Sequence, residues 1–139
     1  MEKTESFRNQ HKEILQVVRE ISPLIKGDQV TGDVNAVRNL LSTLAGKLNV
    51  HLSMEDKVLY PKLLDHQDAN VRLMANKFNN EMGKIKEVFQ GYLQKWQTGI
   101  AIQKDPASFT NDTKGIFDAI SKRIERENNE LYALVDRLS

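Results

Sequence analysis

Apolar residues recur along this chain at alternating steps of four and three residues, in four long segments of mixed polarity. Such spacing puts apolar side chains on one stripe of an α-helix, whereas the alternation with period two that is typical of strands is absent. Gly, Asp and Pro gather in the gaps, at residues 27–33, 66–68 and 99–106. The pattern predicts helices at about residues 4–26, 34–65, 69–98 and 106–138.

Local signals support these helix boundaries. Asp33, Asp68 and Asp105 stand at N-cap positions, where a side-chain oxygen can accept a hydrogen bond from a backbone N–H of the first turn. A proline directly after Asp105 suits the first position of a helix. Pro61 lies inside the second segment, so we expect it to kink that helix or to restart its last turn.

Four long helices joined by short connections predict an all-α fold, an antiparallel up-down-up-down four-helix bundle. The longest connection is expected to be a loop at residues 99–105. A chain of 139 residues can bury a core of its own, so we predict a single domain, residues 1–139.

Composition narrows the possible functions. The net charge of +1 argues against binding to nucleic acid or to anionic membranes through bulk charge. The absence of cysteine excludes disulfides, thiolate metal sites and cysteine nucleophiles, and no serine motif or Gly-rich phosphate loop is present. The start of the chain is charged, and no apolar run reaches the roughly 18 residues of a membrane span. We therefore expect a cytoplasmic protein.

The stripes that face the predicted core are apolar apart from five residues, which are His11, His51, Glu55, Arg123 and Glu127. At a rise of about 1.5 Å per residue, these five lie at the same height in the bundle to within about one turn. They are therefore predicted to form one buried layer. The complete stripes are Phe7, His11, Ile14, Val18, Ile21 and Ile25; Val37, Leu41, Leu44, Leu48, His51, Glu55 and Val58; Val71, Ala75, Phe78, Met82, Ile85, Phe89, Tyr92 and Trp96; and Phe109, Thr113, Ile116, Ile120, Arg123, Glu127, Leu131, Leu134 and Leu138.

A buried layer of histidines and carboxylates favours a metal ion, because burying unpaired charge is costly. His51 and Glu55 are four residues apart, so both side chains leave one helix face and can share an ion. Two other interpretations stay open: the histidines are hydrogen-bonded core residues, and Glu127 forms a buried ion pair with Arg123. His66, at the turn after the second helix, is predicted to be a surface or capping residue.

Three segments of the chain resemble the hemerythrin-like, or HHE cation-binding, domain family, and together they extend over nearly the whole sequence. HLSMEDKVLYPKL at 51–63 is similar to the family's second-helix block of His, Glu four residues later and Leu-Tyr/Phe-Pro. NQHKEILQVV resembles the first-helix motif, with His11 in the ligand position. KRIERENNELYALV resembles the closing motif, with Glu127 in the acidic position and Arg123 in place of its histidine.

The resemblance also implies which ligands are missing. In hemerythrins two histidines of the third helix and one of the fourth hold one iron, the histidines of the first two helices hold the other, and two carboxylates bridge them. Here the third-helix positions align with Phe78 and Met82, with Glu81 beside them. Phenylalanine cannot bind a metal, and methionine offers only a soft thioether. The chain keeps one half of the ligand set: His11, His51, Glu55 and Glu127.

Arg123 is expected to compensate for the lost ion. Its guanidinium would bring positive charge near the position of the missing metal and donate forked hydrogen bonds to the freed oxygens of Glu55 and Glu127. The same charge would oppose a second cation. We therefore expect at most one tightly bound ion per chain.

The predicted function is that of a hemerythrin-like metal-binding protein with a mononuclear or empty site, acting in metal or small-molecule sensing. Reversible O2 binding needs two irons, so an oxygen carrier is not expected, and the sequence favours binding over catalysis. Iron is the favoured ion, and zinc or manganese suits the same ligands. Two alternatives stay open: a metal-free structural or partner-binding bundle in which Arg123 pairs with Glu55 and Glu127, and a mononuclear non-haem iron enzyme.

Overall fold

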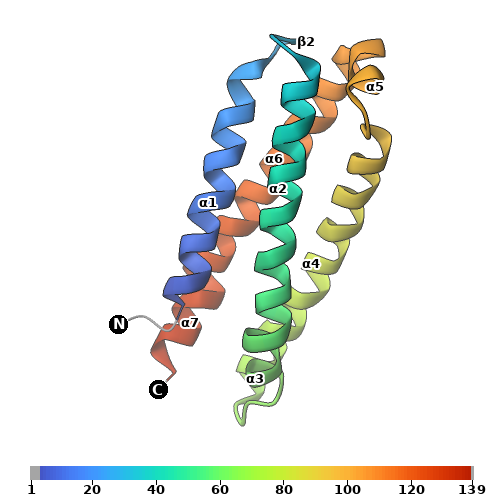
Figure 1. Ribbon diagram of the computed structural model, residues 1–139. Helices are drawn as coiled ribbons and strands as arrows, with labels where there is room; N and C mark the ends of the chain where they lie inside the picture. The colour runs from blue at the N-terminus through green and yellow to red at the C-terminus, as the bar shows by residue number, and fades with distance from the viewer. Residues whose placement is uncertain (1–3, 139) are drawn as a thin grey trace.

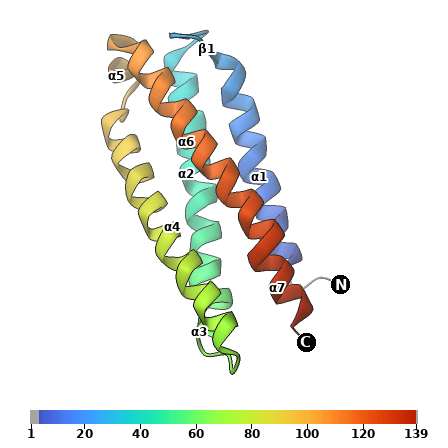
Figure 2. The ribbon, with the colours of Figure 1, turned by 180° about the vertical axis from the view of Figure 1, so that it is seen from behind.

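The computed structural model describes residues 4–138, which form an antiparallel bundle of four long helical rods (Figure 1). The rods are α1, α2 with α3, α4, and α6 with α7, which confirms the predicted all-α class. The start of α1 and the end of α7 lie at one end of the bundle, and a small hairpin and α5 lie at the other (Figure 2). The elements are α1 (Glu5–Ile21), β1 (Ile25–Lys26), β2 (Gln29–Val30), α2 (Val34–Met54), α3 (Tyr60–Leu64), α4 (Ala69–Lys95), α5 (Gly99–Lys104), α6 (Pro106–Arg126) and α7 (Tyr132–Arg137).

The predicted N-caps are confirmed. The side chains of Asp33, Asp68 and Asp105 each accept a hydrogen bond from a backbone N–H in the first turn of α2, α4 and α6. His66 serves the turn before α4, where its Nδ1 accepts a hydrogen bond from the Asp68 N–H. These local bonds set where each rod begins.

The first helix is shorter than predicted, since it ends at Ile21 rather than near residue 26. A 3-10 turn at Ser22–Leu24 follows, and β1 then pairs antiparallel with β2. Pro23 has no N–H with which to continue the helix. Gly27 has φ +61°, which the tight turn between the two strands requires.

The predicted loop at residues 99–105 was wrong, because most of it forms the short helix α5. The Thr98 hydroxyl caps this helix by accepting a hydrogen bond from the Ala101 N–H at 3.2 Å. Ile102 is completely buried and joins the apolar core. A helix of six residues is too short to show the periodicity on which the prediction depended.

A π-turn interrupts the second rod at Glu55–Leu59, and another interrupts the fourth rod at Glu127–Leu131. In each, the backbone N–H of the next residue, Tyr60 or Tyr132, donates to the carbonyl of the glutamate five positions earlier. The first π-turn confirms that the last turn restarts next to Pro61. The second contains no proline and was not predicted.

Each π-turn adds one residue to the helical turn and shifts the buried face by one position. Val58, expected on the core stripe, is therefore 42 % exposed, while Leu59 and Tyr60 are buried. In the fourth rod Leu131 is buried as predicted, together with its neighbour Tyr132.

The core consists of two apolar clusters on either side of the predicted polar layer. One cluster fills the half of the bundle near the hairpin and includes Leu41 and Phe109. The other lies toward the chain ends and includes Phe78 and Leu131. Among residues 4–138 we find no helix that combines the length and the hydropathy of a membrane span.

Candidate metal centre

The polar layer predicted from the sequence exists and is buried. His11 lies on α1, His51 on α2 and Arg123 on α6. The two glutamates, Glu55 and Glu127, are each the first residue of a π-turn. All five residues are at most 5 % exposed. π-turns are rare and occur frequently at functional sites, so their coincidence with both buried carboxylates marks this layer.

The two histidines and Glu127 meet at a single point. The Nε2 atoms of His11 and His51 are 3.0 Å apart, and Oε1 of Glu127 lies 2.8 Å from His11 Nε2 and 3.5 Å from His51 Nε2. These donor atoms form the one group of three potential metal-ligating side chains found within the described part of the chain.

The outer nitrogen of each imidazole is held by a side-chain amide. His11 Nδ1 lies 2.8 Å from the side-chain Oδ1 of Asn128, and His51 Nδ1 lies 2.7 Å from the side-chain Oε1 of Gln10. An amide oxygen only accepts, so each Nδ1 carries a hydrogen and each Nε2 can present its lone pair to the layer. Asn128 and Gln10 were not predicted, because one polar residue among many on a helix gives no signal of its contact.

The two carboxylates have opposite electrostatic character. Burial opposes ionisation of Glu127, but the close approach of His11 and His51 and the charge of Arg123 hold its pKa well below the usual range. Burial, together with the negative charge of Glu127, raises the pKa of Glu55 to about 9. Without an ion, Glu127 is therefore the anion of the layer, and Glu55 keeps its proton at neutral pH.

Tyr132 is a member of this layer that the sequence analysis missed. It is completely buried, and its hydroxyl donates to Oε2 of Glu55 at 2.7 Å. Burial raises the pKa of this phenol, and both carboxylates raise it further. A signal existed in the sequence: Glu, three residues, then Leu-Tyr occurs at 55–60 and again at 127–132.

Arg123 pairs with only one of the two carboxylates, in contrast to the expected fork. Its Nη2 donates to Oε2 of Glu127 at 3.3 Å, to the Phe78 carbonyl at 2.8 Å and to the Tyr60 hydroxyl at 3.1 Å. No hydrogen bond joins Arg123 to Glu55 among residues 4–138. The prediction was wrong there because the guanidinium donates instead to Glu127, the Phe78 carbonyl and the Tyr60 hydroxyl.

A comparison with models of protein families assigns the chain to a family. The family model of the hemerythrin HHE cation-binding domain matches residues 2–135. The chain belongs to this family. No curated protein and no solved structure matches the chain. Metal binding at a layer of this kind is thus the property that the hemerythrin HHE family suggests for it.

The third-helix positions of the hemerythrin pattern hold no imidazole here. Phe78 is buried and its ring lies 4.7 Å below the Arg123 guanidinium carbon, while Met82 is half-buried beside the layer. Glu81 faces outward, where its carboxylate binds Arg126 at 2.6 Å and lies 3.5 Å from Arg123 Nη1. Glu81 therefore does not join the histidine cluster.

The donor atoms lie close enough together to hold a metal ion. Lone pairs of two imidazoles and a carboxylate face one another within 3.5 Å, which is unfavourable unless protons or a cation lie among them. Oε1 of Glu55 is buried without a hydrogen bond and lies 3.5 Å from His51 Nε2. On the other side of the layer, the Arg123 guanidinium and the Phe78 ring stand where further ligands would be needed.

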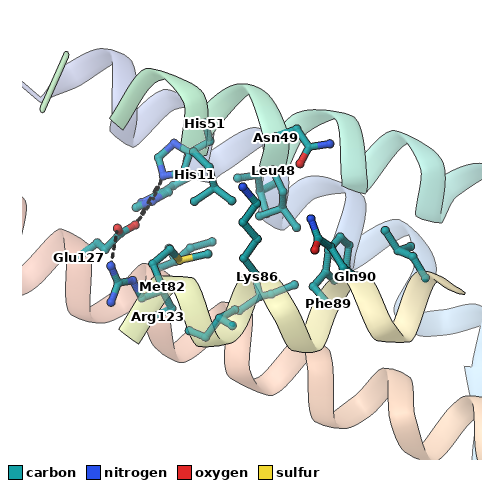
Figure 3. Close-up of a pocket in the computed structure, with 16 residues that line it drawn as sticks. His11, Leu48, Asn49, His51, Met82, Lys86, Phe89, Gln90, Arg123 and Glu127 are labelled. Carbon is teal, nitrogen blue, oxygen red and sulfur yellow. Dashed lines mark hydrogen bonds and ion pairs between the residues drawn. The ribbon is translucent and has the colours of Figure 1, made fainter. Parts of the chain in front are cut away.

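A cavity of about 90 Å³ adjoins the layer (Figure 3). His11, His51, Arg123 and Glu127 line one end of it, and Lys86 and Gln90 of α4 lie farther along. The remaining walls are largely apolar side chains of α1, α2, α4 and α6. A small molecule in this cavity would contact the histidine cluster directly.

Proposed function

We propose that this protein binds one metal ion through His11, His51, Glu55 and Glu127, the half of the hemerythrin ligand set that the chain retains. Its role is the sensing of that metal or of a small molecule rather than oxygen transport. Iron is the ion we favour, since imidazole with carboxylate suits iron, zinc and manganese.

The observation that carries this proposal is the approach of the two Nε2 atoms to 3.0 Å with Glu127 beside them. Amide groups hold both Nδ1 atoms in the orientation that metal-binding histidines commonly show. Glu55 supplies a fourth donor atom, an oxygen, at the edge of the same cluster. When bound, the ion would supply Lewis acidity and, if it is iron, a redox-active centre.

One ion rather than two follows from the charge of Arg123. Its guanidinium is buried within hydrogen-bond distance of Glu127, so it already neutralises that carboxylate from the side of the lost ligands. A second divalent cation there would meet a fixed positive charge in a low-dielectric environment. Reversible O2 binding by two irons is therefore not part of the proposal.

The cavity supports the small-molecule part of the proposal. Its volume of about 90 Å³ and its largely apolar walls suit a small uncharged ligand. Because the histidine cluster forms one end of the cavity, such a ligand would reach the ion without opening the bundle (Figure 3).

Metal analysis after dialysis tests the proposal. Wild-type protein loaded with iron(II) or zinc should retain about one equivalent per chain, and His51→Ala should retain none, because the ligand cluster loses an imidazole. His66→Ala is the matched control, since this third histidine lies at the turn before α4 and contacts Asp68 instead. It should retain the wild-type amount.

Two results would contradict the proposal. Wild-type protein without bound metal would leave the metal-free bundle as the better description of this layer. Two equivalents that survive dialysis would mean that Arg123 does not exclude a second ion.

A further inference from the structure

Tyr132 stands against the histidine cluster because of the second π-turn. Its backbone N–H donates to the Glu127 carbonyl, five residues earlier, which places the two side chains on the same face of the rod. The ring stacks on His11 with centroids 5.1 Å apart, and the guanidinium carbon of Arg8 lies 5.6 Å from the centroid of the Tyr132 ring. The hydroxyl is thereby held inside the layer.

The distances around the Tyr132 hydroxyl match those between ligands of one ion. It lies 3.3 Å from His11 Nε2 and 3.3 Å from His51 Nε2, and these two nitrogens are 3.0 Å apart. Ligand atoms about 2.1 Å from a metal lie about 3.0 Å from each other at right angles and about 3.4 Å apart at the tetrahedral angle. The three atoms thus have the spacing of one triangular face of a coordination polyhedron.

We propose that Tyr132 is a ligand of the metal ion, through its phenolate oxygen; this rests on the proposed function. The O–H bond is replaced by an O–metal bond, and the phenolic proton is released to solvent, as is the proton of Glu55, whose Oε2 lies 2.7 Å from the hydroxyl. No oxidation state changes. A phenolate is a hard anionic donor, so it favours iron(III) over softer or less charged ions.

Tyr60 provides the internal comparison. It occupies the same place in the first Glu-x3-Leu-Tyr segment and also follows a π-turn. Its hydroxyl, however, accepts a hydrogen bond from Arg123 at 3.1 Å, on the side of the layer that lacks ligands. Tyr60→Phe therefore removes a buried hydroxyl of the same kind without touching the histidine cluster.

The experiment is visible absorption and resonance Raman spectroscopy of the protein loaded with one equivalent of iron(III). Wild type and Tyr60→Phe should show a phenolate-to-iron(III) charge-transfer band and tyrosinate ring vibrations enhanced by excitation in that band. Tyr132→Phe, which keeps the ring and its packing, should lose both. Its affinity for iron(III) should fall at least about tenfold, measured by competition with a chelator.

The outcomes separate this inference from the proposed function. Wild-type protein that retains one iron but shows no such band would overturn the role of Tyr132 and leave the proposed site intact. A band that persists in Tyr132→Phe would do the same. Failure of the wild type to bind any metal would overturn both. Circular dichroism of each variant checks that the bundle is folded.

Discussion

At the scale of residues, the polar layer contains a buried negative charge and a buried positive charge that neutralise each other. In the absence of an ion, Glu127 is the buried anion and Arg123 the buried cation, 3.3 Å apart, while Glu55 is neutral at physiological pH because its pKa is about 9. A metal ion would add positive charge on the side of His11 and His51. Arg123 supplies the positive charge on the other side in either state.

Arg123→Ala should strongly destabilise the metal-free protein. The substitution leaves Glu127 with less compensation in a dry layer, and breaking a buried ion pair costs on the order of 3–5 kcal/mol. Thermal unfolding measures the loss. Added zinc should restore part of it, because an ion that binds only the folded state stabilises that state by mass action.

Arg126→Ala is the control for Arg123→Ala. Arg126 also lies over the Phe78 ring and also contacts Glu81, but its side chain is 38 % exposed. Exposed ion pairs contribute at most about 1 kcal/mol, so this variant should melt close to wild type. If the two variants melt alike, Arg123 does not stabilise the fold by neutralising Glu127.

At the scale of elements, the two π-turns decide which side chains reach the layer. Each begins at a buried glutamate and ends before a buried tyrosine, in the two segments that share the pattern Glu-x3-Leu-Tyr. The tyrosines serve opposite sides: Tyr132 binds Glu55, and Tyr60 binds Arg123. The repeated pattern therefore places one tyrosine on each side of the polar layer.

Deletion of Asn129 should be tolerated. It removes one exposed residue from the second π-turn, which can then close as an ordinary α-turn and leave Tyr132 on the same face. Deletion of the exposed Glu125, inside the regular part of α6, should instead rotate Glu127 and Tyr132 by about 100° relative to the preceding turns. We expect a loss of more than about 3 kcal/mol for the second deletion, since large buried side chains leave the core.

Thermal unfolding of the two deletion variants distinguishes these cases. The midpoint of the Asn129 deletion should lie within a few degrees of wild type, and that of the Glu125 deletion well below it. Equal destabilisation by both would mean that the π-turn is required for packing in its own right.

At the scale of the whole molecule, α4 is the rod that contributes no imidazole to the layer. Phe78 and Met82 stand at its hemerythrin ligand positions, and the cavity next to the histidine cluster is bordered by the same rod. The site is therefore built mainly by α1, the second rod and the fourth rod, while α4 provides apolar wall.

Restoring the missing imidazoles should restore the second ion. The triple variant Phe78→His, Met82→His and Arg123→His adds three nitrogen donors and removes the opposing charge, so it should bind about two metal equivalents. Arg123→His alone, the control, should still bind one, because α4 then supplies no histidine. Metal analysis after dialysis measures both; one equivalent in the folded triple variant would contradict this account.

The fold could be predicted from the sequence because its signals are local. Steps of four and three residues mark each rod, and Asp33, Asp68 and Asp105 mark the starts of three of them. The short elements could not be predicted in the same way. Six residues of α5 and two residues in each strand carry no periodicity of their own.

The convergence of His11, His51, Glu55 and Glu127 followed from their heights along the rods, and the family resemblance indicated what such a layer does. The contacts of these side chains could not be predicted from either the heights or the resemblance. That Tyr132 rather than Arg123 binds Glu55, that Glu81 turns outward to Arg126, and that amides hold the two imidazoles are properties of the assembled bundle. The position of a residue along a helix follows from the sequence and the regular geometry of the helix. Contacts at about 3 Å depend also on how far the π-turns rotate each rod and on how closely neighbouring rods pack.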